Sequence, residues 1–337
     1  MRASFAIAIL YHCICGYNLP VVIGVDLGGT NVRAAAVSAA GEIVGPRIEN
    51  PSHAREGADA CLAAVVRTIL EAMAGIGAES IGIAIPGHID AIKGVVHWAP
   101  NFGETVEGDF RNWEDVTFTP VLAKQIDLPI TIGNDANLAA LGEYRFGSGK
   151  ACANGLVLLT LGTGVGSGIV LSPACLQGGL TRPSMLIGNK GGAAELGHLT
   201  IVKDGATCTC GARGHLEAYC GAEGLLKIAA AHGIVCESPL QLFEEAQTGN
   251  ESAIAAWEVY GGYLGTAIGS AINAFAPEIV AIGGQVANAW RYFLPEATLA
   301  AAQTSIPSLF DTVRIVQAEQ FEDAGILGAA ALALGEL

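Results

Sequence analysis

Residues 21–37 read VVIGVDLGGTNVRAAAV, which is an apolar run, a glycine turn and a second apolar run. The β-branched first run, the turn Gly28-Gly29-Thr30-Asn31 and the run Val32–Val37 predict strand, tight turn and strand. The glycines let the backbone approach a ligand closely, and Thr30 and Asn31 add polar groups. An ordinary hairpin turn would explain the glycines, but it would not explain Asp26 at the end of the strand.

The same design recurs at residues 155–171, which read GLVLLTLGTGVGSGIVL and place Thr163 and Gly164 in the turn. Two glycine-turn hairpins of this kind in one chain indicate two structurally similar halves. The pattern lacks the G-K-[ST] of a Walker A loop, and it does not open a helix as the dinucleotide-binding G-x-G-x-x-G does.

Strand-like and helix-like segments alternate through the rest of the chain, which predicts an α/β fold. We expect a strand near Ile43, and a loop at Ala99-Pro100-Asn101-Phe102 in which Asn101 faces a pocket or simply lies in a surface turn. Further strands are expected at Ile81–Ile85, 128–132, Ile279–Ile282 and 313–316, and helices at Ala58–Met73, Leu225–Ala231, Ser252–Phe275 and Ala324–Leu334. Glycines at 261, 262, 265 and 269 predict close packing of that long helix.

The composition is that of a globular protein with a large core. Of the 337 residues, 51% are hydrophobic and 15% are charged, which argues against disorder. A net charge of −15 argues against a nucleic-acid partner. Most of the nine cysteines are predicted to be buried thiols in a reducing cytosol, with no disulfide framework. No stretch beyond the start of the chain is a convincing membrane span.

The first 20 residues, MRASFAIAILYHCICGYNLP, resemble a weak signal peptide, but His12 interrupts the apolar run and no clear cleavage site follows. We interpret them as an N-terminal extension of a cytoplasmic protein, with export as the alternative.

Asp135 lies where a predicted strand runs into a helix, in the sequence GNDAN at 133–137. Open α/β sheets bind ligands at the carboxyl ends of their strands, so this carboxylate is a candidate catalytic base. A helix N-cap is the commoner role for Asp at such a junction. The motif alone leaves the two roles equally open.

The stretch GHLTIVKDGATCTCGARGHLE at 197–217 offers four potential metal ligands, His198, Cys208, Cys210 and His215. Four such ligands can close a tetrahedral structural zinc site. Glu195 and Glu217 flank the ligands, so a metal there would also fix two carboxylates. The alternatives are a metal-free loop held by hydrogen bonds, and solvated or capping carboxylates.

Taken together, these motifs resemble the ROK family of sugar kinases, and most of all its glucokinase branch. The resemblance runs from about Val21 to the C-terminus. It is carried by DLGGTNVR at 26–33, IAIPGHID at 83–90, APN at 99–101, NDAN at 134–137, LGTGVGSGIV at 161–170, ELGH at 195–198, CTCGARGHLE at 208–217 and IGG at 282–284. The family usually has a third cysteine where this chain has His215, and imidazole is also a good zinc ligand.

The resemblance implies an α/β, actin-like (ribonuclease-H-like) ATPase fold with two lobes around a central cleft. After the extension at 1–20, a small lobe would comprise residues 21–136 and 312–337. A large lobe carrying the zinc motif would comprise residues 137–311.

It also implies roles for individual residues in phosphoryl transfer from ATP to a hexose. Asp135 matches the family's general base, which takes the proton from the 6-hydroxyl of the sugar. The sugar-binding positions fall on Gly87, Asn101, Asn134, Glu195, His198 and Glu217. The phosphates of ATP would lie on the two glycine turns, at Gly28, Gly29, Thr30, Asn31, Thr163 and Gly164. Mg²⁺ would lie near Asp26, and the adenosine near Gly283 and Gly284. Zinc would be bound by His198, Cys208, Cys210 and His215.

Glucose is the expected acceptor, with N-acetylmannosamine, mannose, fructose and allose as alternatives, and ATP is favoured over polyphosphate as the donor. We expect a homodimer or homotetramer with no nucleic-acid or membrane partner. One rival is a repressor of the same family, but twenty mostly apolar residues cannot form its DNA-binding domain. The other is a sugar-binding regulator without catalysis, against which Asp135 and both hairpins argue.

Overall fold

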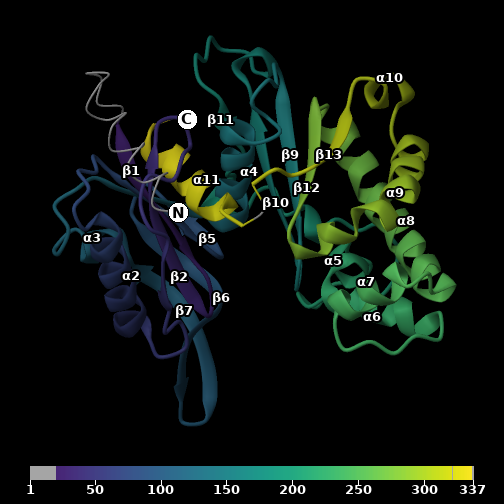
Figure 1. Cartoon of the computed structure of the whole chain (residues 1–337), viewed down its shortest axis with the longest axis horizontal. Coiled ribbons are helices and arrows are strands. Elements are labelled where there is room, and N and C mark those ends of the chain that lie inside the picture. The colour runs from purple at the N-terminus through teal and green to yellow at the C-terminus, as the bar shows by residue number, and fades with distance from the viewer. Residues whose placement is uncertain (1–19, 321, 336–337) are drawn as a thin grey trace. The chain divides into compact units, whose positions relative to one another are not determined.

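Two five-stranded sheets of the same design form the framework of the molecule (Figure 1). The computed structural model describes residues 20–320 and 322–335. In the first sheet, of order β3-β2-β1-β4-β8, the hairpin β1–β2 continues antiparallel into β3, and β4 and β8 follow parallel to β1. These strands are β1 (Val21–Leu27), β2 (Asn31–Ser38), β3 (Ile48–Pro51), β4 (Ile81–Ile85) and β8 (Ile130–Asn134).

The second sheet has the order β11-β10-β9-β12-β13 and repeats these directions strand by strand. Its strands are β9 (Gly155–Leu161), β10 (Val165–Leu171), β11 (Ser184–Met185), β12 (Ile279–Gly283) and β13 (Arg314–Gln317). The predicted duplication is therefore confirmed. Each half begins with a glycine-turn hairpin and adds two parallel strands on one side of it.

The described chain divides into two compact units, each with its own sheet. The first runs up to Gly142 and adds Asn189–Gly191 and the part from Asp323, and the second comprises Glu143–Gly188 and Gly192–Glu322. The lobe boundaries expected at 136/137 and 311/312 stay a prediction. Two elements differ from these boundaries. Helix α4 (Asp135–Phe146) runs across the expected boundary at 136/137, and β13, which lies beyond the expected boundary at 311/312, pairs with β12 in the second sheet.

Three helices accompany the first sheet: α2 (Ala58–Met73), α3 (Thr119–Leu122) and α11 (Ala324–Ala333). Helix α2 buries Leu62, Val65 and Ile69 at helical spacing, as its sequence pattern predicts. Full burial of each such side chain contributes about 1.5–3 kcal/mol. Helix α11 lies so close to the sheet that a Cβ at Gly82 would be 1.8 Å from the carbonyl oxygen of Ala329. Glycine in β4 is therefore required for this contact.

The second unit carries α5 (Glu217–Cys220), α6 (Ala222–Ala231), α7 (Pro239–Gln247), α8 (Glu251–Phe275), α9 (Trp290–Thr304) and α10 (Pro307–Phe310). Helices α8 and α9 lie side by side (Figure 1). A Cβ at Gly261, Gly265 or Gly269 would lie within 2.8 Å of a backbone carbonyl oxygen of α9. These glycines therefore allow the close approach that their spacing predicts.

A three-stranded antiparallel sheet in the first unit is not anticipated by the sequence pattern. It consists of β5 (His88–Asp90), β6 (Val95–Val106) and β7 (Asp109–Thr117). Strand β6 contains the expected loop at Ala99–Phe102, so that expectation is wrong. The strand expected near Ile43 is also wrong: Ile43 forms an isolated bridge with Val37, and the third strand of the sheet is β3.

Short 3₁₀ helices complete the chain at η1 (Pro173–Cys175), η2 (Asn189–Gly191), η3 (Leu196–His198) and η4 (Gln285–Ala289). None of the helices formed by residues 20–320 and 322–335 combines the length and the apolar character that crossing a membrane requires. The extension expected over residues 1–20 lies, up to residue 19, outside the described residues.

Candidate active site

The N-terminus of α4 is capped by Asn134 rather than by Asp135. The side-chain oxygen of Asn134 accepts a hydrogen bond from the backbone N–H of Asn137 at 3.0 Å, the bond that an N-cap residue makes to the third helical residue. Asp135 is the first residue of the helix, and its Oδ1 accepts from the N–H of Ala136 at 2.8 Å. The carboxylate of Asp135 therefore lies at the positive end of the helix dipole.

Asn134 also connects this helix end to the segment that follows β4. Its Nδ2 donates a hydrogen bond to the carbonyl oxygen of Gly87 at 3.1 Å. Gly87 has φ +98°, and a Cβ there would lie 2.0 Å from the carbonyl oxygen of Trp98. Only glycine fits this position. The bond from Asn134 to Gly87 brings three predicted site residues, Gly87, Asn134 and Asp135, together in the first unit.

Asp26 at the end of β1 is electrostatically coupled to Asp135. Burial, and then the negative charge of Asp135, raise the pKa of Asp26 from 3.8 to about 6, while Arg33 opposes the shift. The negative charges of Asp26 and Asp135 repel each other. A cation bound near both carboxylates would remove this repulsion, so the pair is suited to a cation site. Oxygen ligands are also what Mg²⁺ prefers, so Asp26 fits the expected position near this ion.

The first glycine turn is closed by a hydrogen bond from the N–H of Gly28 to the carbonyl oxygen of Asn31 at 2.9 Å. Gly29 and Thr30 are exposed at its tip, where backbone N–H groups can meet an anion. The side chain of Asn31 is turned toward β3, and its Nδ2 donates to Glu49 Oε1 at 2.6 Å. Asn31 would therefore serve a phosphate through its backbone and not through its amide.

Asn101 lies on β6 in a left-handed conformation, with φ +65°, where the register to β7 shifts between Ala99 and Gly103. Such a bulge changes the direction in which a strand side chain points, and bulges are frequent beside active sites. Asn101 is exposed. Its predicted role in sugar binding stays a prediction.

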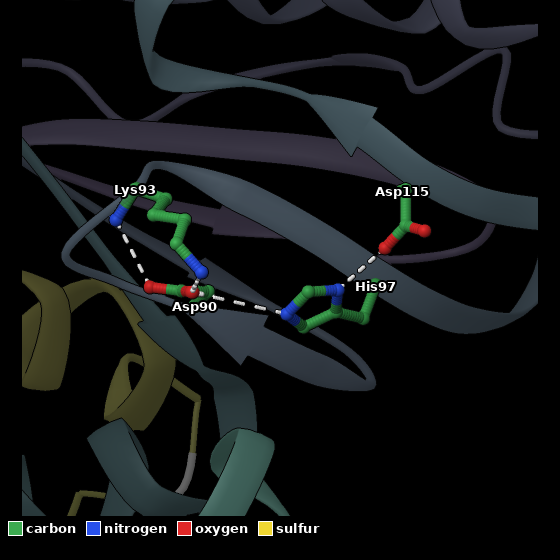
Figure 2. A network of polar contacts seen from close by, with 4 residues as sticks. All are labelled: Asp90, Lys93, His97 and Asp115. Carbon is green, nitrogen blue, oxygen red and sulfur yellow. Dashed lines mark hydrogen bonds and ion pairs between the residues drawn. The ribbon is translucent and has the colours of Figure 1, made fainter.

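A polar network ties the three strands of this small sheet together (Figure 2). His97 on β6 contacts Asp115 on β7, Nδ1 to Oδ1, at 2.5 Å, and its Nε2 lies 3.9 Å from Asp90 Oδ2 on β5. Lys93 completes the network with Nζ 3.1 Å from Asp90 Oδ2. The contacts with Lys93 lower the pKa of Asp90. The network therefore links the three strands near the segment that carries Asn101.

In the second unit, Glu217 holds the second glycine turn. Its Oε2 accepts a hydrogen bond from the backbone N–H of Val165 at 3.1 Å, and its Oε1 accepts from the hydroxyl of Thr209 at 2.5 Å. A Cβ at Gly164 would lie 2.4 Å from Glu217 Oε2. The sequence motif marks Glu217 as a sugar ligand but does not reveal its contact with a turn 52 residues earlier.

The four predicted metal ligands come together in the second unit. One ligand atom from each of His198, Cys208, Cys210 and His215 lies within 4.8 Å of the others. His198 Nδ1 is 3.6 Å from Cys208 Sγ, and His215 Nδ1 is 3.3 Å from Cys210 Sγ. Ligands of a tetrahedral zinc ion lie about 3.4–3.8 Å apart, given Zn–S near 2.3 Å and Zn–N near 2.0 Å. The donor set and its spacing therefore fit zinc.

Glu195 is exposed and directly precedes η3, which contains His198. The buried hydroxyl of Ser167 on β10 anchors this segment: it accepts from the N–H of Leu196 at 2.9 Å and donates to the carbonyl oxygen of Ala194. Glu195 is thus held in place by its two neighbours. Ser167 is a supporting residue that the sequence motifs do not single out.

Gly283 ends β12, where it pairs with Thr160 of β9, and Gly284 follows it. Gly284 has φ +80°, and a Cβ there would lie 2.3 Å from the carbonyl oxygen of Leu161. The segment therefore packs directly against the strand that leads into Thr163. In this unit the structure gathers the second glycine turn, the IGG segment, Glu217 and the metal cluster at one end of the sheet.

Comparison with known proteins gives consistent matches over nearly the whole chain. The ROK family profile matches residues 22–336. The glucokinase of Thermotoga maritima is 33% identical over 325 residues, which cover 92% of this chain and 96% of that protein. The ROK hexokinase from Thermus thermophilus has a similar structure, with a TM-score of 0.76 and 30% identity, covering 94% of this chain and 98% of that one. A ROK family glucokinase from Streptomyces griseus, solved with glucose and AMPPNP, has a TM-score of 0.74 and 26% identity, covering 94% of this chain and 99% of its own.

Proposed function

The chain belongs to the ROK family, and from this premise we propose that it is a sugar kinase that transfers a phosphoryl group from ATP to a hexose. Glucose is the proposed acceptor, because two relatives that are 33% and 30% identical over more than nine-tenths of the chain are named glucokinases. The bound AMPPNP and glucose of the Streptomyces griseus enzyme support ATP as the donor and a hexose as the acceptor.

The observation that carries the proposal is the assignment of the α4 cap to Asn134. Since Asn134 makes the bond to the N–H of Asn137, the N-cap position belongs to Asn134 and not to Asp135, although Asp135 also accepts from the N–H of Ala136. A carboxylate at a strand end and at a helix N-terminus suits a base that receives the proton of the acceptor hydroxyl. We propose this role for Asp135.

Phosphoryl transfer depends mostly on positioning and on neutralising charge. The N–H groups of the two glycine turns would bind the phosphates, and Gly283 and Gly284 would border the adenosine. Mg²⁺ near Asp26 would neutralise phosphate charge when bound. Asn101, Asn134, Glu195, His198 and Glu217, together with the backbone at Gly87, would bind the sugar hydroxyls. Zinc on His198, Cys208, Cys210 and His215 would be structural, fixing the segments from which Glu195 and Glu217 extend.

An ADP-release assay over a panel of hexoses, with ATP as the donor, tests the proposal. Direct measurement of the hexose phosphate formed compares ATP with polyphosphate, since polyphosphate releases no ADP. We expect the wild type to phosphorylate glucose, or one of N-acetylmannosamine, mannose, fructose and allose. Asp135→Asn should lose most of the rate, since a general base contributes about 10²–10⁴-fold, while it still binds hexose. Equal turnover by Asp135→Asn would exclude this residue as the base. Hexose binding without turnover by the wild type would favour a sugar-binding regulator.

Cytoplasmic location and assembly as a homodimer or homotetramer are part of the same proposal. Multi-angle light scattering on the purified chain measures the oligomeric state. A monomer at the concentrations used for the kinetic assay would contradict this part alone.

A further inference from the structure

The carboxylate of Glu217 is held by the glycine turn and by the metal-ligand loop, where Cys208 Sγ also lies 3.8 Å from its Oε1. Its Oε2 accepts from the backbone N–H of Val165 at 3.1 Å, and its Oε1 accepts from the hydroxyl of Thr209 at 2.5 Å. Glu217 itself is the first residue of α5. One side chain therefore joins the glycine turn, the metal-ligand loop and the start of a helix.

Thr209 is fixed more firmly than its exposure suggests. It lies between Cys208 and Cys210, two members of the metal-ligand cluster. The loop is also closed on itself, because the N–H of Gly211 donates to the carbonyl oxygen of Cys208 at 2.9 Å and the N–H of Cys208 donates to Ala212 at 2.8 Å. The hydroxyl of Thr209 is thus presented from a constrained backbone.

The contact with Val165 is equally constrained. Val165 begins β10 directly after the turn, and the turn is closed by a hydrogen bond from the N–H of Gly162 to the carbonyl oxygen of Gly164 at 3.0 Å. A side chain at Gly164 would overlap Glu217 Oε2, at 2.4 Å from a built Cβ. The carboxylate therefore fits against the turn only because residue 164 is glycine.

We propose that Thr209 is a positioning residue that orients the carboxylate of Glu217 for the hexose. The metal-ligand loop would then position sugar-binding groups through the hydroxyl of Thr209 as well as through the residues that would bind the metal. This inference rests on the proposed hexose kinase function. Two anchored oxygens fix the plane of the carboxylate, and their remaining lone pairs can accept from sugar hydroxyls. Without the Thr209 hydroxyl, Oε1 keeps only the long 3.8 Å contact with Cys208 Sγ among the contacts of the described residues. The carboxylate would then rotate more freely about its terminal bond and hold a hexose less well.

The test compares Thr209→Val, which replaces the hydroxyl with a methyl group of similar volume, with Thr209→Ser, which keeps the hydroxyl. Thr207→Val is the matched control, because Thr207 is an exposed threonine of the same loop that pairs with Arg213 only through the backbone bridge. Three readouts are taken on the full chain: the Kd for glucose by calorimetry without nucleotide, the KM and kcat for glucose, and the zinc content by elemental analysis.

We expect Thr209→Val to raise the Kd and KM for glucose about three- to tenfold, which is within the range for the net loss of one ordinary hydrogen bond. Zinc content should not change and kcat should change little, while Thr209→Ser and Thr207→Val behave as the wild type. An unchanged Kd in Thr209→Val overturns the inference, as does a raised Kd that accompanies zinc loss. If the wild type neither binds nor phosphorylates any hexose, the proposed function fails first and this inference fails with it.

Discussion

Asn134 accepts a hydrogen bond from the backbone N–H of Asn137 and thereby caps the helix that Asp135 begins. The same amide group donates to the carbonyl oxygen of Gly87. Asn134 therefore supports the candidate base on one side and the Gly87 backbone on the other.

Asn134→Ala should lower stability and hexose affinity together. Loss of the cap costs about 1 kcal/mol, and loss of the bond to Gly87 adds a comparable amount. Asn250→Ala is the matched control, since Asn250 caps α8 by accepting from Ser252 and Ala253. Thermal midpoints and hexose titrations should show that both alanine variants lose stability and only Asn134→Ala loses affinity. Equal hexose binding by Asn134→Ala and the wild type would show that the contact with Gly87 is not needed by the site.

Stability should fall as the pH rises from about 4 to about 6, because of Asp26. Its pKa is about 6 in the folded protein and 3.8 when unperturbed, so the folded state binds more protons in that interval. The contribution is present in full below pH 4 and is lost above pH 6. A shift of about two units corresponds to at most about 3 kcal/mol. Asp26→Asn should therefore be more stable than the wild type at pH 7 and close to it at pH 4, measured by urea unfolding without added metal.

Asp90→Asn is the control for that experiment, because the contribution of Asp90 to stability depends on pH in the opposite direction. The pKa of Asp90 is lowered, first by the hydrogen bond from the backbone of Lys93. Its contribution is present above the unperturbed pKa of 3.8 and is lost as the pH falls. A stability difference between Asp26→Asn and the wild type that is the same at pH 4 and pH 7 would contradict the assignment to Asp26.

The repeated hairpin pattern is sufficient to predict two similar halves that each begin with a hairpin, because apolar runs and glycine turns are local features. The range of α2 was predicted for the same reason: its apolar residues recur at helical spacing. The sequence could not decide between cap and base for Asp135, since that depends on whether Asn134 reaches the N–H of Asn137. The sequence predicts a loop at Ala99–Phe102, whereas pairing with β7 on both sides of Asn101 makes the segment a bulged strand.

The bond from Val165 to Glu217 could not be predicted at all, because it joins residues far apart in the sequence. The prediction of a strand near Ile43 is wrong. Ile43 forms only an isolated bridge with Val37, and the strand that pairs with β2 on this side is β3. For the segment near Ile43, pairing between strands therefore overrides local strand propensity.

Removal of the metal should destabilise the second unit, and His215 should be needed to bind it. His215 Nδ1 lies 3.3 Å from Cys210 Sγ within the ligand cluster. We expect bound zinc in the wild type, a lower thermal midpoint after chelation, and reduced zinc in His215→Ala. His215→Cys should restore zinc binding, since thiolate is also a zinc ligand. His232→Ala is the control, because this ring bonds only to the carbonyl oxygen of Ile228 on its own helix among the contacts of the described chain. Unchanged zinc content in His215→Ala would remove this residue from the ligand set.

Two neighbouring glycines of α8 should respond oppositely to the same substitution. A Cβ at Gly265 would lie 2.2 Å from the carbonyl oxygen of Ala297 on α9, so Gly265→Ala must push the helices apart. Overpacking of this kind costs about 1–3 kcal/mol. At Gly262 the nearest neighbouring atom, Glu296 Cγ, is 4.0 Å away, and alanine exceeds glycine in helix propensity by about 1 kcal/mol. Gly262→Ala should therefore raise the thermal midpoint while Gly265→Ala lowers it. Midpoints that move in the same direction would contradict the close packing of α8 against α9.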